Sequence, residues 1–138
     1  MADYNKVGLL VIREDRILLC QKRGLSRLIL PGGTLEPGET PEACLHREIR
    51  EELGDVVARD LEYLGTYRDR AASDDPSVVK TVEIQLYRGE IAGQPVASSE
   101  IEALIWFSRE SDRELLSLIL INAILPDLAR RGVLGWGE

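Results

Sequence analysis

Three glutamates, Glu48, Glu51 and Glu52, are the residues of this sequence whose type and spacing point most directly to chemistry. They lie three or four residues apart in a segment with helical periodicity, and at about 100° per residue they share one helix face. Apolar residues repeat every four positions on a neighbouring face, which would dock the helix onto a core: Leu45, Ile49 and Leu53. Like charges on one face repel one another, and a hard divalent cation such as Mg²⁺ relieves this repulsion because it prefers clustered carboxylate oxygens. The competing interpretation is a solvated acidic face, which short charge patterns often form.

The residues before this helix predict how it is positioned. Gly32 and Gly33 follow an apolar run and let a ligand or a metal ion approach the backbone closely. Pro37-Gly38 suits the centre of a type II turn, since proline sets φ and glycine supplies a positive φ. Thr40 is a good N-cap and Pro41 fits the first helical position. The segment therefore predicts a strand, a loop, a tight turn and a capped helix, in that order.

Residues 33–55 resemble the Nudix box, G-x5-E-x7-R-E-U-x-E-E-x-G-U, in which U is a bulky apolar residue. The fixed positions are matched by Gly33, Glu39, Arg47, Glu48, Ile49, Glu51, Glu52 and Gly54. Asp55 departs from the pattern at the final apolar position, which packs and carries no chemistry, and Val56 follows one residue later. The resemblance is far more specific than a lone glycine-rich loop. It implies an α/β Nudix fold, a mixed β-sheet sandwiched between helices (α/β/α), with residues 1–138 as one domain.

The resemblance also implies roles for individual residues. Glu51 and Glu52 are expected to bind the metal ion, Mg²⁺ with Mn²⁺ as a substitute, together with the backbone carbonyl of Gly33. Glu48 would be a third ligand or the general base, and a second base candidate lies in the loop before a Trp-containing strand, where Glu100 is favoured over Glu102. In the same scheme Arg47 orients the carboxylates, and Glu39 offers a contact to the metal shell through water.

Substrate-binding candidates lie outside the acidic face. Arg23 and Arg27 directly precede the box, and a guanidinium suits phosphate oxygens, although both are equally well explained as solvated loop charges. Gln85 lies on a long alternating strand, where it would face a base or simply solvent.

The Nudix resemblance implies hydrolysis of a nucleoside diphosphate linked to a group X. MutT-like hydrolysis of nucleoside triphosphates is favoured by size and by the absence of the residues that mark other substrates. ADP-ribose, nucleotide sugars and dinucleoside polyphosphates remain alternatives, as does a non-catalytic nucleotide-sensing module.

Composition narrows the classes of partner. The 138 residues carry 24 acidic and 17 basic side chains, a formal net charge of −7, which disfavours binding to a nucleic-acid polymer. Cys20 and Cys44 are expected to be free buried thiols in a reducing cytoplasm. No charged-then-apolar leader opens the chain, and the longest apolar stretch, Leu115 to Leu125, is too short to span a bilayer. A small nucleotide is therefore the expected partner.

The remaining elements follow from periodicity and breakers. Lys6–Ile12 and Arg16–Lys22 predict a hairpin around a polar turn. Further strands are expected at Leu61–Tyr67, Val78–Ile91 and Leu104–Phe107, with loops at Arg68–Ser77 and Ala92–Ser99. The sequence also predicts a helix from Arg109 to about Ala129, capped by Ser108, which would cover the core or form a homodimer surface.

Overall fold

The computed structural model describes residues 2–71, 74–77 and 79–136, and its larger sheet is mixed. Its strands are β1 (Tyr4–Leu10), β4 (Gly32–Thr34), β5 (Val57–Arg70) and β6 (Thr81–Ala92), in the order β4-β1-β6-β5. β1 runs parallel to β6, whereas the β1–β4 and β5–β6 pairs are antiparallel. Central β1 is thus paired on both sides, and it carries β4, the strand that begins the box.

A second sheet of three antiparallel strands continues from the first. It contains β2 (Ile12–Arg13), β3 (Arg16–Lys22) and β7 (Ile101–Phe107), in the order β2-β3-β7. Glu14 and Asp15 both take positive φ values in the turn between β2 and β3, a conformation that aspartate tolerates better than most residues. The expected hairpin around this polar turn is therefore confirmed.

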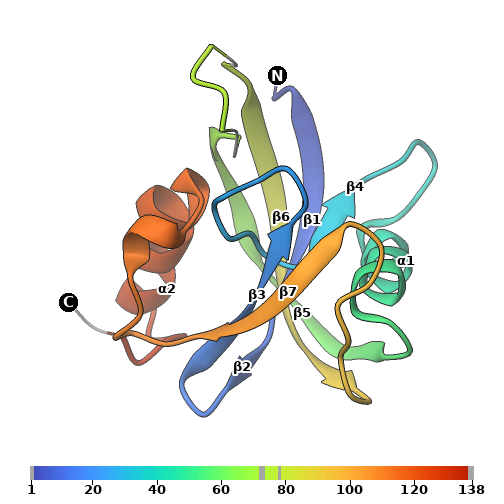
Figure 1. Ribbon diagram of the computed structural model, residues 1–138. Coiled ribbons are helices and arrows are strands. Elements are labelled where there is room, and N and C mark those ends of the chain that lie inside the picture. Colours follow the sequence, from blue (N-terminus) through green and yellow to red (C-terminus); the bar gives the residue numbers. More distant parts are fainter. Residues whose placement is uncertain (1, 72–73, 78, 137–138) are drawn as a thin grey trace.

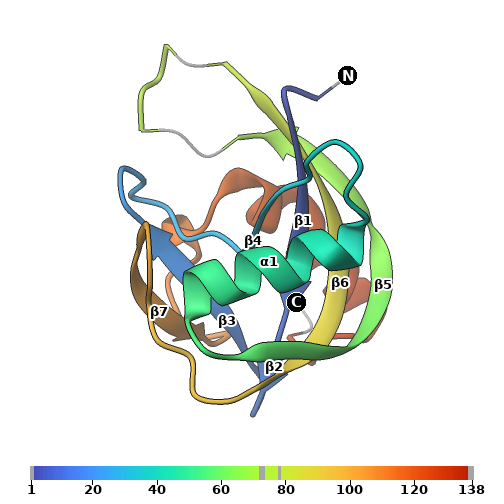
Figure 2. The same cartoon turned by 90° about the vertical axis from the view of Figure 1, so that its right-hand side faces the viewer.

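Helices cover the sheets from opposite sides, as Figures 1 and 2 show. α1 (Pro41–Leu53) lies on one side, and the C-terminal helical segment lies on the other, where a π-helical stretch, η2 (Leu120–Ile124), runs into α2 (Leu125–Arg130). Buried side chains form two clusters, one including the apolar face of α1 and the other including the C-terminal segment. The α/β architecture with strands between helices is as expected. No helix in the described part of the chain is long and apolar enough to cross a membrane.

The alternation along β6 decides which of its side chains enter a core. Val82, Ile84 and Leu86 are buried and join the cluster beneath the C-terminal segment, while the residues between them are partly exposed. This is the period-two pattern predicted from the sequence. It directs Val82 and Ile84 towards the pocket described below.

Several predicted strand boundaries differ from those observed. Arg68–Arg70, expected in a loop, continues β5, because the backbone there pairs with Glu83 to Thr81 of β6. The predicted start of the next strand, Val78, lies outside the described residues, and β6 begins at Thr81. β7 begins at Ile101, three residues before the predicted start.

The predicted helix from Arg109 is also wrong in its first half. Ser108 bonds to Ser111 instead of capping a helix, and a 3-10 turn, η1 (Arg113–Leu115), follows. The backbone of Leu28 forms two hydrogen bonds with this part of the chain. Its N–H donates to the carbonyl of Leu115, and its carbonyl accepts from the N–H of Ser117. These bonds hold Leu116 in an extended conformation, so the main C-terminal helical segment begins only after Ser117.

Candidate active site

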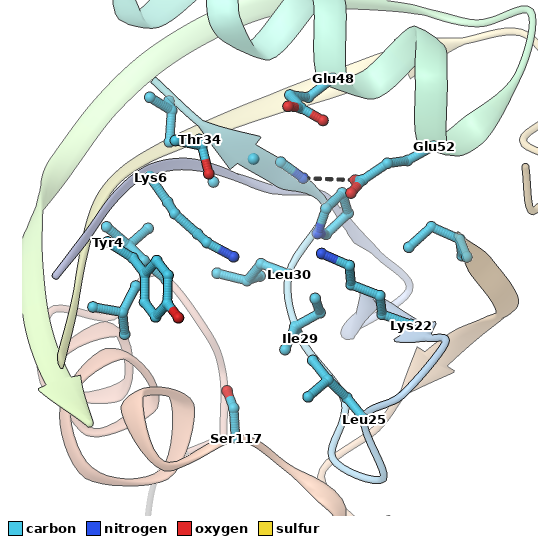
Figure 3. Close-up of a pocket in the computed structure, with 18 of the residues that line it drawn as sticks. Tyr4, Lys6, Lys22, Leu25, Ile29, Leu30, Thr34, Glu48, Glu52 and Ser117 are labelled. Atoms are coloured by element: carbon cyan, nitrogen blue, oxygen red, sulfur yellow. Dashed lines mark hydrogen bonds between the residues drawn. The ribbon is translucent and has the colours of Figure 1, made fainter. Parts of the chain in front are cut away.

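A pocket of about 580 Å³ opens beside α1, where β1, β3 and β4 meet (Figure 3). One wall is acidic and carries Glu48, Glu51 and Glu52. Two ammonium groups, those of Lys6 and Lys22, project into the pocket from the sheets. The remainder is mainly apolar and includes Leu25, Ile29, Leu30, Val82, Ile84 and Leu120. The volume is in the range of small-molecule sites.

The acidic wall is oriented by the packing of α1. The Thr40 hydroxyl accepts the N–H of Ala43 at 3.1 Å, and Pro41 occupies the start of the helix, as predicted. Leu45, Ile49 and Leu53 are fully buried in the core. Because this apolar stripe fixes the rotation of the helix, the three glutamates on the neighbouring face line the pocket.

Glu52 is the most buried of these carboxylates, with only 9% of its surface exposed. Its Oε1 accepts the backbone N–H of Gly32 at 2.9 Å. Burial, aided by the negative charge of Glu48, raises the pKa of Glu52 to about 7, against the opposing effects of the Gly32 N–H and of Lys22 and Lys6. The acidic wall is thus electrostatically strained, and a bound cation would relieve it.

Arg47 connects α1 with the loop before it. Its Nε and Nη2 donate to the two oxygens of Glu39 at 2.7 and 3.0 Å, and its Nη1 donates to Glu48 at 2.9 Å. Nη2 also reaches the carbonyl of Thr34 at 3.2 Å, and Glu51 lies 3.8 Å from Nη1. Hydrogen bonds from Arg47 lower the pKa of Glu39 to about 2. A single guanidinium therefore holds the turn, β4 and the acidic wall in one arrangement.

Gly33, which begins the box, and Gly32 before it are both required by close contacts. A Cβ on Gly32 would lie 2.1 Å from the carbonyl oxygen of Val7, and its φ of +138° disfavours any side chain. A Cβ on Gly33 would lie 2.1 Å from Cδ of Glu48. The carboxylate of Glu48 therefore packs directly against the Gly33 backbone.

Replacing Gly33 by alanine should separate activity from folding. The new methyl group meets only the flexible end of Glu48, so the chain folds while the carboxylate is displaced by an ångström or more, and turnover falls about 10²-fold. Steady-state rates and thermal unfolding of the same preparations measure both effects. Gly32→Ala is the matched contrast, because its methyl group meets backbone and should lower stability itself. A Gly33→Ala protein with wild-type turnover would contradict this account of Glu48.

The structure brings some of the remaining predicted residues to the pocket and not others. Arg23 and Glu100 lie on its rim, where Glu100 pairs with Lys22 at 3.4 Å and Arg23 approaches Glu102 at 3.9 Å. Arg27 instead donates to the backbone carbonyls of Glu114 and Leu116, at 3.2 and 2.8 Å.

Gln85 and Glu39 also lie away from the pocket lining. Gln85 is on the opposite face of β6 from Val82 and Ile84, which line the pocket. Glu39 contacts Arg47 and so acts on the site from behind it. Arg27 and Gln85 are therefore not among the residues proposed to bind the substrate.

Lys6 and Lys22 are pocket residues that the sequence analysis missed. Tyr4, Lys6 and Gly8 alternate along β1 and line the pocket, whereas the side chains of Val7 and Leu9 are fully buried in the core. A lysine on the inward side of a central strand is the signal that would have identified Lys6. Lys22 ends β3, where the strand reaches the rim.

The donor set of the acidic wall fits a hard divalent ion. It consists of carboxylate oxygens with a glycine backbone beside them, the ligands that Mg²⁺ and Mn²⁺ accept. Within the described residues no three acidic, cysteine or histidine side chains are already gathered around one point. The reason is visible in the contacts: Arg47 draws Glu48 and Glu51 towards itself, while Glu52 bonds to Gly32.

The chain belongs to the Nudix family, whose NUDIX domain model matches residues 4–117. Members of this family are hydrolases that act on phosphorus-containing anhydrides, and the carboxylates, Arg47 and the box glycines described above lie within the matched region.

Relatives within the family differ in name and length. The chain is 36% identical over 101 residues to the NAD-capped RNA hydrolase NudC of Pseudomonas putida, which covers 72% of this chain and 34% of that protein. It therefore spans about a third of the NudC relatives it matches. It is 34% identical over 124 residues to a Mycobacterium tuberculosis protein named "Putative 8-oxo-dGTP diphosphatase 2", with 87% and 84% of the two chains covered.

Solved structures agree on the fold. The chain is similar to the Escherichia coli ORF135 protein, with a TM-score of 0.72, 25% identity and coverage of 94% and 91% of the two chains. A MutT Nudix hydrolase from Burkholderia pseudomallei gives a TM-score of 0.71 at 26% identity, covering 86% and 93%.

Proposed function

We propose that this protein is a metal-dependent pyrophosphohydrolase of the MutT type, which hydrolyses a nucleoside triphosphate to a nucleoside monophosphate and pyrophosphate. The observation that carries the proposal is the division of one pocket into an acidic wall, a pair of ammonium groups and an apolar end. These parts suit a divalent ion, a polyphosphate chain and a nucleoside, respectively. The Mycobacterium tuberculosis relative, which is matched over most of its length, supports the same substrate class.

The residues divide the work as follows. Glu51, Glu52 and the carbonyl of Gly33 hold the metal ion, which is Mg²⁺ or, as a substitute, Mn²⁺. When bound, the ion neutralises charge on phosphate oxygens and lowers the pKa of water. Glu48 is either a further ligand or the base that accepts the proton of the attacking water, and Glu100 on the rim is the other candidate base. Arg47 keeps Glu48 in place through its 2.9 Å hydrogen bond.

A second candidate substrate is NAD in free or RNA-linked form, because the NudC relatives are 36% identical over the shared region. The net charge of −7 disfavours the RNA-linked form, since a polyanion is attracted to basic surfaces. The two free buried cysteines are consistent with a reducing cytoplasm as the place of reaction. Homodimerisation stays a prediction.

Product release across a substrate panel tests the proposal. The panel holds ordinary and oxidised (d)NTPs, NAD, ADP-ribose, nucleotide sugars and dinucleoside polyphosphates, each with Mg²⁺ and with EDTA, and Glu52→Gln is the inactive control. We expect a nucleoside triphosphate to be cleaved fastest, giving pyrophosphate, in the presence of Mg²⁺ only. Faster cleavage of NAD or ADP-ribose would reject a nucleoside triphosphate as the substrate. Silence towards every compound, with nucleotide binding intact, would favour a sensing module.

A further inference from the structure

Two of the three lysines of this chain converge in the pocket. Lys6, Lys22 and Lys80 are the lysines of the sequence, and the first two line the site, whereas Lys80 is exposed before β6. Lys6 enters from β1 and Lys22 from the end of β3. Figure 3 shows both ammonium groups pointing into the middle of the pocket, below Glu52.

Protein carboxylates do little to neutralise this pair. Among the described residues Lys22 pairs with Glu100, an exposed residue on the rim, at 3.4 Å. In the described part of the chain, Lys6 makes no ion pair, because no carboxylate oxygen lies within 4.0 Å of its Nζ. Its recorded partner is the ring of Tyr4, whose centroid lies 5.9 Å from Nζ. Burial and the charge of Lys22 both lower the pKa of Lys6, and the charges of Glu52 and Glu48 oppose this effect less strongly.

The simplest alternative is that Lys6 serves as a counter-ion for the acidic wall. A counter-ion would be expected to make an ion pair with Glu52 or Glu48, but Glu52 bonds to Gly32 and Glu48 bonds to Arg47. The two ammonium groups instead point towards each other across the pocket (Figure 3). Their electrostatic repulsion is unfavourable as long as no anion lies between them. A group with several anionic oxygens would remove this cost.

We propose that Lys6 and Lys22 form a clamp for the phosphoryl oxygens of the substrate, and that Lys6 sets the position of the phosphate chain relative to the acidic wall. This inference rests on the proposed function and names the groups that bind the polyphosphate. β1 and β4 are paired so that Lys6 lies opposite Thr34, the residue after Gly33. Lys6 is therefore anchored on the strand that also positions the Gly33 backbone. Lys22 and Arg23 contact the phosphate chain of the substrate nearer the rim of the pocket.

Pyrophosphate is the probe that tests the clamp, because it carries the anionic oxygens and no nucleoside. Calorimetric titration in Mg²⁺ should show that Lys6→Met weakens pyrophosphate binding by about 10-fold to 100-fold, as expected for a lost charge-assisted hydrogen bond. Lys6→Arg should restore part of the affinity. Lys80→Met is the matched control and should bind like the wild type. In turnover, Lys6→Met should raise KM for the best substrate of the panel.

Lysine acylation of the wild-type protein, read by mass spectrometry, tests the clamp without any substitution. Pyrophosphate with Mg²⁺ should protect Lys6 and Lys22 and leave Lys80 as reactive as before. Equal reactivity of Lys6 with and without pyrophosphate, or unchanged affinity in Lys6→Met, would overturn the clamp. A protein that cleaves its substrate normally with Lys6→Met refutes the clamp alone. One that binds pyrophosphate through Lys6 but cleaves nothing in the panel retains the clamp and refutes the proposed hydrolysis.

Discussion

Glu52→Gln should produce a folded protein whose metal-dependent turnover is lower by about 10³-fold or more, the scale on which removal of one charge-stabilising group in an active site acts. The amide retains the hydrogen bond from the Gly32 N–H but lacks the anionic oxygens that a divalent ion requires. Initial rates with saturating Mg²⁺ measure the effect. Glu42→Gln, in the exposed first turn of the same helix, is the control and should remain active. A Glu52→Gln enzyme with a rate near that of the wild type would refute the site.

The same substitution should stabilise the metal-free protein. Burial raises the pKa of Glu52 from 4.5 to about 7, so the folded state binds this proton more tightly than the unfolded state does. Stability therefore falls as pH rises from about 4.5 to about 7, by on the order of 3 kcal/mol at 1.4 kcal/mol per pKa unit. Glu52→Gln lacks this loss.

Thermal unfolding in EDTA between pH 5 and pH 8 measures the difference. The melting temperature of Glu52→Gln should exceed that of the wild type increasingly as pH rises, and Mg²⁺ should close the gap by stabilising the wild type. We expect Glu51→Gln to lose activity similarly but to change metal-free stability little, because more than half of its side chain is exposed. A pH-independent gap for Glu52→Gln would contradict the assigned pKa.

Arg47→Lys should lower turnover about 10²-fold, because Glu48 loses the group that fixes its position. An ammonium cannot reproduce the paired hydrogen bonds to Glu39 together with those to Glu48 and Thr34. Arg50→Lys, on the exposed side of the same helix, is the control and should behave like the wild type.

The pH dependence of the stability of Arg47→Lys should show how much the hydrogen bonds between Arg47 and Glu39 stabilise the fold. The pKa of Glu39 is about 2 in the folded protein, so its stabilisation by Arg47 is complete above about pH 4.5 and disappears as pH falls towards 2. The melting temperature of Arg47→Lys should therefore lie below that of the wild type at pH 7 and approach it in acid. A difference that stays constant down to pH 2 would show that Glu39 is not the partner that matters.

Local chemistry sufficed to predict the acidic wall. Thr40, Pro41 and the apolar stripe of α1 determine where the helix begins and which way it faces, and both effects act over a few residues. The spacing of the glutamates then places all three on one side. Gly32 and Gly33 were expected to allow close approach, and the contacts that a Cβ would make there agree.

The residues opposite that wall are brought there by long-range strand pairing. Lys6 is 42 residues before Glu48, and it reaches the pocket because β1 pairs with both β4 and β6, a register that no local pattern encodes. Distant backbone and side-chain contacts likewise removed Arg27 from the pocket, extended β5 through Arg68–Arg70, and held Leu116 and Ser117 out of the expected helix. Local sequence patterns were enough to predict the carboxylates, their helix and the family. Which cations and apolar side chains complete the site depends on backbone hydrogen bonds between residues far apart in the sequence, which local patterns do not encode.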